Sequence, residues 1–453
     1  MMTKRRTALV LLACFALASV TTQTTAARRY RERTTAIATG VTYTVVRDAS
    51  GPFRIRYVTI DPSAPGTLDT VLANDKLPKF ETTSSMAQRT GAIAAINGDF
   101  ARSDGRPVFT FASDGYLAQT PLSWGRNFAT TWDGSGTYIG HPEVTGWAYE
   151  ANGGTTYPIS LVNFSDTPLD PSEVRLFTFQ GGSAAPAPAG HCLVRLQPVE
   201  PPYTAAEAGV EQDFIVERVE CGGRSLRPRG GVILASTLDS QYALALASMT
   251  VNEEVTVGWS MTWPRVLDAI GGNPSLIEAG QIVSKNVDGC GSFCSRHPRS
   301  GVGTTPDGTV ILATVDGRQP GYSVGMTLRE FAELFYSLGA DYALNLDGGG
   351  STALALNGSL VNRPSDRLDD GTRVERGVSS ALVLLPGGDP GEAPQPEPSP
   401  STVLPLTPST SWSSGAIARD PASTGGMLDA FARRGAWMPV GLRHMLAVFR
   451  NSR

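Results

Sequence analysis

Hydrophobic and polar residues alternate with a period of two over long stretches of the chain, a pattern typical of strands with one buried face. The alternation is clearest over residues 42–60, where Ala-Ser-Gly-Pro at 49–52 interrupts it, so we expect two strands joined by a turn. Two apolar runs, at 91–96 and 310–315, indicate buried strands. Residues 108–263 carry many glycine and proline breaks and little helical periodicity, which predicts a strand-rich middle segment.

Apolar residues have helical spacing in two segments. Residues 77–90 form one predicted amphipathic helix. The clearer helix covers residues 327–338, where Thr327 and Glu330 have the spacing of a capping box and Gly339 marks the end. Few helices, many strands and no regular alternation of the two predict an α+β fold with mixed sheets and a single large domain.

The two ends of the chain differ in composition from the middle. Residues 1–27 combine a basic start, an apolar run and small residues at the end, which is the layout of a secretory signal peptide. The apolar run is too short for a membrane anchor, so we expect cleavage and a secreted or cell-envelope protein without a transmembrane helix. Residues 387–425 are rich in Pro, Ser, Thr, Gly and Glu, which predicts a linker, and residues 426–453 form a short C-terminal tail. The expected domain is residues 35–386.

The charge and the cysteine count narrow the class of protein. The formal net charge is −4, and it becomes −7 once the three basic residues of the leader are removed, so nucleic acid is not an expected partner. The exported chain would keep four cysteines, and an even number in an exported protein favours disulfides. The most local pairing joins Cys192 to Cys221 and Cys290 to Cys294. A zinc site with neighbouring histidines is the alternative, although paired Cys-x-x-Cys halves are lacking.

Residues 343–352 (Ala-Leu-Asn-Leu-Asp-Gly-Gly-Gly-Ser-Thr) are the strongest candidate for a functional site. Apolar and polar residues alternate there, so Asn345 and Asp347 point to the same side at the end of a strand. The three glycines that follow allow the backbone to fold close to a ligand and expose N–H groups that suit an anion. A hairpin turn at Asp-Gly is the alternative, but three glycines exceed what such a turn needs.

Two further strand ends repeat this design. One apolar run ends in Asn97 and Asp99, and another ends in Asp316 and Arg318. Alone, each would predict a turn. Their repetition indicates a shared pocket, in which arginines can hold phosphate bidentately and carboxylates can act as acid, base, nucleophile or metal ligand.

The ordered motifs resemble those of the phosphodiester glycosidase family, which includes the uncovering enzyme N-acetylglucosamine-1-phosphodiester alpha-N-acetylglucosaminidase and secreted bacterial relatives. The matching blocks, in chain order, are 96–100, 297–303, 315–318, 325–334, 345–352 and 375–379. The resemblance implies hydrolysis of a sugar-1-phosphodiester in an extracellular or cell-envelope glycan, with release of a sugar and a phosphomonoester.

The resemblance also implies roles for individual residues. The acidic centre would be Asp347 with Asp316, and Glu375 is a third acid or base candidate. The arginines and the glycine amides would hold the phosphate, whereas amide and carboxylate side chains would orient sugar hydroxyls or a metal. The expected substrate-binding residues are Asn97, Asp99, Arg299, Arg318, Asn345, Gly348, Gly349, Gly350, Ser351 and Arg376.

Two alternatives stay open at this stage. Clustered Asp and Asn oxygens suit calcium better than zinc, so calcium is a candidate cofactor beside the alternative of none. A non-catalytic envelope protein that binds glycans or anions would keep the same pocket without turnover. A metallophosphodiesterase that acts on nucleotides or lipids fits less well, because the chain has four histidines and no paired His/Asp metal signature.

Overall fold

The computed structural model describes residues 30–387, with internal gaps at 122–124, 133, 135, 152, 165–168, 182–189 and 200–210. All of the described residues belong to one compact unit. The predicted signal peptide, the predicted C-terminal tail and the predicted linker beyond residue 387 lie outside the described residues. Among the described helices, none has the length and apolar content needed to cross a membrane.

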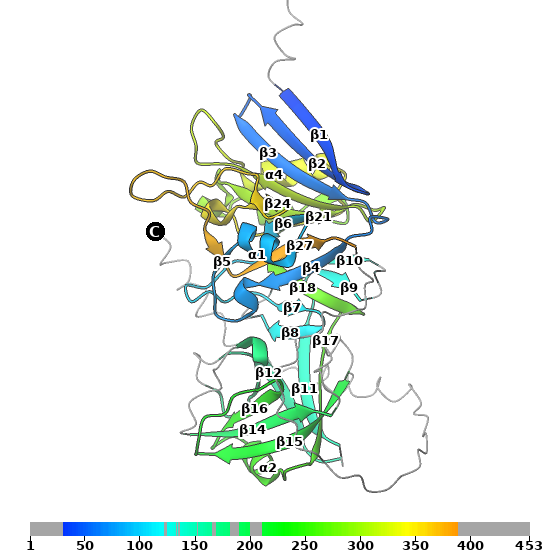
Figure 1. The fold of residues 1–453 in the computed structure, drawn as a ribbon, viewed down its shortest axis with the longest axis vertical. Helices are drawn as coiled ribbons and strands as arrows, with labels where there is room; N and C mark the ends of the chain where they lie inside the picture. The colour runs from blue at the N-terminus through cyan, green and yellow to red at the C-terminus, as the bar shows by residue number, and fades with distance from the viewer. Residues whose placement is uncertain are drawn as a thin grey trace, which may run out of the picture. The chain divides into compact units, whose positions relative to one another are not determined.

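Three antiparallel sheets carry most of the strands outside a separate barrel (Figure 1). The first sheet has the order β1 (Tyr30–Ala38), β2 (Val41–Asp48), β3 (Phe53–Ile60), β22 (Val310–Val315), β21 (Arg299–Thr304), β23 (Tyr342–Asn345), β19 (Ser275–Glu278) and β20 (Gln281–Ile282). The second has the order β25 (Ser359–Leu360), β24 (Leu354–Leu356), β6 (Ala94–Asn97), β27 (Ser380–Leu385) and β4 (Thr67–Leu72). The third has the order β10 (Thr137–Gly140), β9 (Arg126–Thr131), β18 (Val266–Gly272), β7 (Phe111–Ser113) and β8 (Tyr116–Gln119). A short ladder also pairs β26 (Gly377–Val378) with β5 (Glu81–Thr82).

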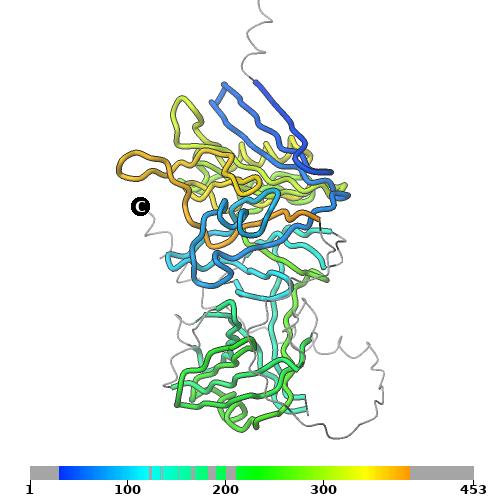
Figure 2. The backbone as a smooth tube through the Cα atoms, in the orientation of Figure 1, coloured from blue at the N-terminus to red at the C-terminus, as the bar shows by residue number. Residues whose placement is uncertain are grey.

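The strand-rich middle segment forms a closed barrel. Its strand order is β11 (Val144–Glu150), β12 (Thr156–Val162), β13 (Val174–Phe177), β16 (Val232–Thr237), β14 (His191–Pro198), β15 (Glu211–Cys221) and β17 (Glu254–Met261). These strands are consecutive in the chain, and the strands before and after them, β10 and β18, both pair with β9 of the third sheet. The barrel is therefore an insertion between strands of one sheet, as the backbone path shows (Figure 2).

The helices are few and short. They are α1 (Thr83–Thr90), α2 (Ala243–Ser248), α3 (Ser284–Val287) and α4 (Leu328–Ser337), with 3₁₀ turns η1 (Ala73–Asp75), η2 (Phe179–Gly181), η3 (Gly291–Cys294) and η4 (Gly349–Ser351). The predicted class with few helices is confirmed, and strands predominate. Among the described strands, parallel and antiparallel pairing occur together in the barrel, where β12 pairs parallel with β13. The predicted capping box of α4 is also confirmed, because Glu330 N donates to Thr327 Oγ1 and Thr327 N donates to Glu330 Oε2. The helix predicted over 77–90 begins only at Thr83, since residues 81–82 pair with β26.

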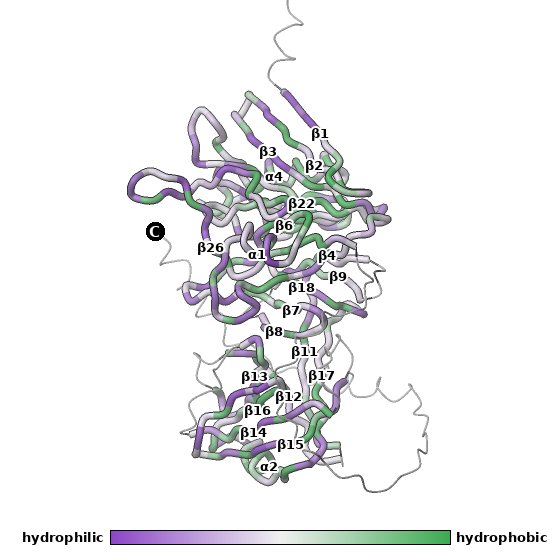
Figure 3. The backbone as a smooth tube through the Cα atoms, in the orientation of Figure 1, coloured by the Kyte–Doolittle hydropathy of each residue, from purple (hydrophilic) through white to green (hydrophobic). Residues whose placement is uncertain are grey.

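The cores explain how these elements hold the candidate site. Apolar residues of all three sheets form one cluster, which includes Val58, Ile96, Phe128 and Leu344. Figure 3 shows the corresponding hydrophobic colouring along β6 and β22. The barrel core is continuous with residues of the third sheet, and Trp259 of β17 donates from Nε1 to the Gly115 carbonyl at 3.1 Å.

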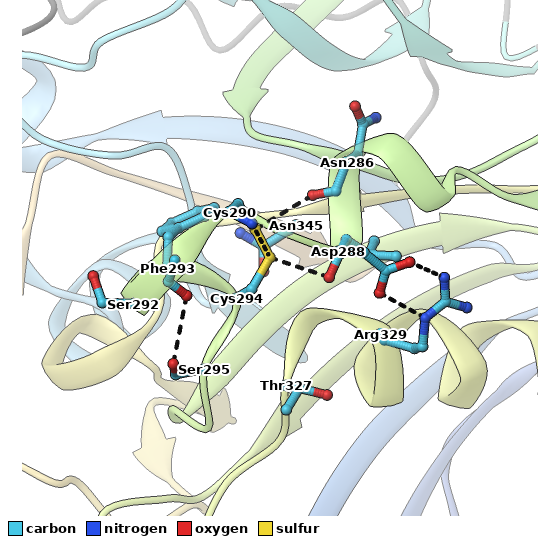
Figure 4. The surroundings of a disulfide bond; sticks show 12 residues. Asn286, Asp288, Cys290, Ser292, Phe293, Cys294, Ser295, Thr327, Arg329 and Asn345 are labelled. Atoms are coloured by element: carbon cyan, nitrogen blue, oxygen red, sulfur yellow. Dashed lines mark hydrogen bonds and ion pairs between the residues drawn. A yellow bond between two sulfur atoms is a disulfide. The ribbon is translucent and has the colours of Figure 1, made fainter.

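Both predicted disulfides are present. Cys192 and Cys221 lie directly opposite each other on β14 and β15. Cys290 and Cys294 close the short loop that contains η3 (Figure 4).

Candidate active site

The first sheet brings two of the predicted strand ends to one edge. Strands β22 and β23 both pair antiparallel with β21, so they run in the same direction and end where β21 begins. The register places Arg299 opposite Val315 and Gly301 opposite Asn345. Because β21 lies between them, the ends of β22 and β23 are two strand spacings apart, roughly 10 Å.

Asn97 joins the end of the second sheet to this edge. Its Nδ2 donates to the Asp347 carbonyl at 2.7 Å, and its Oδ1 accepts hydrogen bonds from Ser300 Oγ (2.7 Å) and Ala353 N (3.1 Å). The Asp347 amide in turn donates to the Gly98 carbonyl at 3.1 Å. The buried Asn97 side chain therefore holds the Asp347 loop in place.

The Asp347 carboxyl group has an unusual environment. Burial raises its pKa to about 6, whereas hydrogen bonds from the Ser351 hydroxyl and the Gly348 amide limit the increase. The positive charges of Arg376 and Arg318 act in the same direction as these hydrogen bonds. A carboxyl group with this pKa changes its charge between mildly acidic and neutral pH, which suits acid–base or nucleophilic chemistry.

The backbone after Asp347 needs glycine for two local reasons. Gly349 has a φ of +63°, a conformation that side chains disfavour, and its N–H donates to the Pro298 carbonyl at 2.9 Å. A Cβ atom on Gly348 would lie 2.8 Å from the same carbonyl oxygen. The loop therefore packs closely on Pro298, and the Gly349 amide, predicted to face an anion, already has a protein partner.

Two exposed arginines flank the glycine loop. A Cβ atom on Gly349 would lie 3.0 Å from Arg318 Nη2, and a Cβ on Gly350 would overlap the Arg376 guanidinium. Arg376 forms an ion pair with Asp366 at 2.7 Å, so Asp366 also lies near the glycine loop. Each guanidinium keeps further N–H groups for a ligand, because arginine has five donors.

His297 lies next to Arg318. The sequence showed this histidine only as the first residue of the 297–303 motif and did not indicate its contact with Arg318. Its Nε2 lies 2.9 Å from the Ser292 carbonyl, and Arg318 Nε donates to its Nδ1 at 3.4 Å. Burial lowers its pKa, and the charges of Arg318 and Arg299 lower it further. Neutral His297 thus positions the Arg318 guanidinium beside the glycine loop.

Arg299, expected to hold phosphate, donates instead to backbone carbonyls. Its Nε donates to Met326 (3.1 Å), and its Nη2 donates to Phe293 (2.8 Å) and Ser295 (2.6 Å). The side chain is buried, and burial lowers its pKa to about 10. These contacts make Arg299 an anchor for the disulfide-closed loop drawn in Figure 4.

Asp316 likewise has a full set of protein donors. Its Oδ2 accepts from Arg56 Nη1 (2.6 Å) and Tyr322 OH (3.1 Å). Its Oδ1 accepts from Arg363 N (3.0 Å) and Asn362 Nδ2 (3.3 Å). Asp316, which was predicted as the second acid of the centre, thus has both carboxylate oxygens engaged by protein donors.

Glu375, the third acid or base candidate, caps a helix. Its carboxylate accepts hydrogen bonds from the amide of Ser84 (2.9 Å) and from the hydroxyl of the same residue, in the first turn of α1. A carboxylate at a helix N-terminus stabilises the unpaired amides and the positive end of the helix dipole.

Asp99 and Asn345 lie beneath the Asp347 loop. Asp99 Oδ2 accepts from Phe109 N at 2.6 Å, and burial raises the pKa of Asp99 well above its usual range, with a further contribution from the charge of Asp347. Asn345 Nδ2 donates to the Asn273 carbonyl (2.7 Å), while its buried Oδ1 has no hydrogen-bond partner among the described residues. The charge of Asp347 therefore acts on the buried Asp99 carboxyl group.

A separate group of three carboxylates suits the calcium hypothesis better than the residues near Asp347. Side chains of Asp69, Asp114 and Asp268 place their carboxylate oxygens within 4.8 Å of one another. Burial raises the pKa of all three, and that of Asp268 reaches about 7. The sequence pattern does not indicate this group, because its members come from three separate places in the chain: β4, the turn after β7, and β18.

We expect Asp268→Asn to stabilise the protein more at pH 8 than at pH 5. A pKa that folding raises contributes stability at low pH, and this contribution is lost as the pH rises through about 7. Asparagine removes the charge, so its gain at pH 8 should exceed that at pH 5 by on the order of 2 kcal/mol. Thermal unfolding with a chelator measures the effect, and an equal gain at both pH values would contradict it. Repeating the wild-type measurement with calcium would show an increase in Tm if the three carboxylates bind the ion.

Comparison with known proteins finds partial matches to this chain. Residues 204–385 match the model of the protein family described as Phosphodiester glycosidase. An uncharacterised SPbeta prophage-derived protein of Bacillus subtilis is 42% identical over 89 residues, which are 20% of this chain and 13% of that protein. The N-acetylglucosamine-1-phosphodiester alpha-N-acetylglucosaminidase of Mus musculus is 34% identical over 118 residues, 25% of this chain and 22% of the enzyme. The chain thus matches less than a quarter of the length of either relative.

Solved structures share the fold. A candidate exported protein of Burkholderia pseudomallei has a TM-score of 0.59 and 19% identity, over 79% of this chain and 96% of that protein. The fold and the site define a β-rich protein with a partly buried carboxyl group near two exposed arginines. Over residues 204–385, less than half of its length, the chain is similar to the phosphodiester glycosidase family. The matched region contains the Asp347 loop and both arginines, whereas Asn97 and Asp99 precede it in the chain.

Proposed function

We propose that this protein hydrolyses a sugar-1-phosphodiester of an extracellular or cell-envelope glycan by breaking the bond between the anomeric carbon and the phosphate oxygen. The observation that carries the proposal is the partly buried Asp347 carboxyl group, on which the charges of the exposed Arg318 and Arg376 act. The family match over residues 204–385 supports the reaction class. The disulfides and the exported structural relative support a location outside the cytoplasm.

The two arginines suit the phosphate part of such a substrate. Cleavage at carbon leaves a phosphomonoester, which gains a second negative charge and has a conjugate acid with a pKa of about 6. Guanidinium groups bind phosphate oxygens bidentately and would stabilise this developing charge. Arg318 and Arg376 would therefore assist departure of the leaving group without the transfer of a proton to it.

The anomeric carbon needs a nucleophile or a base, and Asp347 is the residue we assign to that role. Its ionised form would attack the carbon or remove a proton from the attacking water. Burial raises the pKa of Asp99, and the charge of Asp347 raises it further, so ionised Asp347 disfavours the ionisation of Asp99.

This assignment predicts how the rate depends on pH. If ionised Asp347 is the active form, kcat/KM should rise as the pH increases through about 6 and level off above it. The measurement is a pH–rate profile on a soluble sugar-1-phosphodiester. A profile that falls through the same pH would show instead that protonated Asp347 acts as a general acid.

Turnover in ¹⁸O-labelled water tests the reaction itself. We expect a panel of sugar-1-phosphodiesters to yield sugar and phosphomonoester together, with the label in the sugar, because water adds to carbon. Label in the phosphate would show attack at phosphorus and overturn the assigned bond cleavage. Binding to a glycan array without any product would favour the non-catalytic alternative, and parallel reactions with a chelator would reveal a metal requirement.

A further inference from the structure

A second basic site lies on the barrel. A cavity of about 230 Å³ is lined by the side chains of Arg195, Arg218, Arg224, Ser225, Leu226, Arg227 and Arg229. We call it the arginine pocket. It shares no residue with the site around Asp347, and it stands out in a chain whose formal net charge is −4.

Two of the arginines form the part of the pocket built from strands. Arg195 of β14 lies directly opposite Arg218 of β15, a like-charge arrangement that destabilises a ladder unless other charges compensate. Arg195 Nε and Nη2 donate to Glu217 at 2.8 and 2.5 Å, and Arg218 Nε donates to Glu220 Oε1 at 2.7 Å. The strand arginines are therefore neutralised by protein carboxylates.

The other three arginines come from the connection between β15 and β16, which are labelled in Figure 3. Arg224, Arg227 and Arg229 are all exposed. Within the part of the chain that the structure describes, no carboxylate forms an ion pair with any of them. Glu217 and Glu220 also interact electrostatically with Arg229 and Arg224. Among the described residues, the five arginines of the cavity outnumber these two glutamates by three.

Several contacts fix this connection. The Cys192–Cys221 disulfide lies at its start, and the buried side chain of Leu226 packs in a small core with Leu193 and Ile233. Gly231 N donates to the Pro228 carbonyl at 2.9 Å. These three contacts fix the backbone of the connection, so little backbone entropy is lost when its arginines bind a ligand.

We propose that the arginine pocket binds phosphate groups of an anionic glycan as a second, non-catalytic site. Guanidinium groups recognise phosphate oxygens bidentately, and the excess of arginine over glutamate favours a ligand with several negative charges. Among the described residues, the lining contains no aromatic side chain, whereas single-stranded nucleic acid is usually bound by stacking on aromatic residues. The choice of a glycan as the phosphate carrier rests on the proposed function, but the binding of phosphate does not.

Binding of inorganic tripolyphosphate to the exported, disulfide-bonded chain tests the pocket. To keep the probe away from the Asp347 site, all proteins carry Arg318→Gln and Arg376→Gln. The pocket variant adds Arg224→Gln, Arg227→Gln and Arg229→Gln. The control variant adds Arg31→Gln, Arg33→Gln and Arg47→Gln instead, three exposed arginines of β1 and β2.

We expect the pocket variant to bind tripolyphosphate at least about tenfold more weakly than the parent, and the control variant to bind it like the parent. Because both variants lose three charges, their difference reports on the location of the arginines and not on net charge. Raising the salt concentration should weaken binding to the parent more steeply than to the pocket variant. Equal binding by the two variants would overturn the proposal.

A turnover experiment then tests the choice of a glycan. With Arg318 and Arg376 restored, the pocket variant should cleave a small sugar-1-phosphodiester normally but lose about tenfold in kcat/KM on a polymeric glycan phosphodiester. An equal loss on both substrates would contradict a second site for the polymer. Pocket-dependent binding that is tighter for a single-stranded oligonucleotide or for anionic lipid vesicles would overturn the glycan assignment. Failure of the wild-type chain to turn over any substrate would refute the proposed function and leave the tripolyphosphate result standing.

Discussion

Asp347→Asn is expected to lower kcat/KM by about 10³- to 10⁴-fold, because amide replaces the carboxylate that we assign to the anomeric carbon. Ground-state binding should change little, since Arg318 and Arg376 still hold the phosphate. The matched control is Asp369→Asn, an exposed aspartate in the loop before Glu375, which should retain full activity. Unchanged turnover in Asp347→Asn would remove Asp347 from the mechanism.

The same variant should be more stable than the wild type at pH 8. Folding raises the pKa of Asp347 to about 6, so its contribution to stability is lost as the pH rises through that value. Asparagine carries no charge, and we expect a gain of about 2 kcal/mol at pH 8 in urea unfolding. Loss of activity together with a gain in stability is typical of a residue kept for chemistry, whereas misfolding would lower both.

Asp316→Ala should have the largest effect on stability, with a loss of about 3–5 kcal/mol in the free energy of unfolding. The substitution leaves the guanidinium of Arg56, which is almost buried, without its partner, and it also removes the acceptor of Tyr322 OH. Asp288→Ala is the control, because Asp288 pairs with Arg329 at an exposed position and should cost at most about 1 kcal/mol. Urea unfolding of both variants measures the difference.

Activity distinguishes support from catalysis at Asp316. The milder Asp316→Asn keeps the shape of the side chain, so its folded molecules should retain most of their turnover. If this variant folds stably yet loses turnover as completely as Asp347→Asn, Asp316 belongs to the acidic centre that the family resemblance implied.

Local features of the fold could be predicted because their causes lie within a few residues. The capping box of α4 needs two side chains three positions apart, and both hydrogen bonds form as expected. The apolar runs at 91–96 and 310–315 contain β6 and β22, since both faces of these strands are buried. The barrel was not predicted, because closure depends on which strands pair, and β13 pairs with β16 rather than with β14.

The candidate site was predicted in outline but not in its contacts. The alternation that ends at Asp347 and the glycines after it indicated the loop from sequence alone. The partners of Asp316 and Glu375 could not be inferred, because Arg56, which pairs with Asp316, and Ser84, which donates to Glu375, are more than 200 positions away in the chain. The arginine pocket could not be predicted from composition either, because the chain as a whole has more acidic than basic residues.

The sequence by itself determined the strand-rich class, the two disulfide pairings, the α4 helix and the polar loop after β23, because spacing and turn chemistry act over a few residues. Tertiary structure alone decided which predicted polar groups are satisfied by the protein and which stay available to a ligand. The Asp316 carboxylate is saturated because the distant strand β3 and nearby loops supply its donors, whereas Asp347 lies near exposed arginines at the end of its strand. That distinction depends on burial and on long-range partners, which only the folded chain creates.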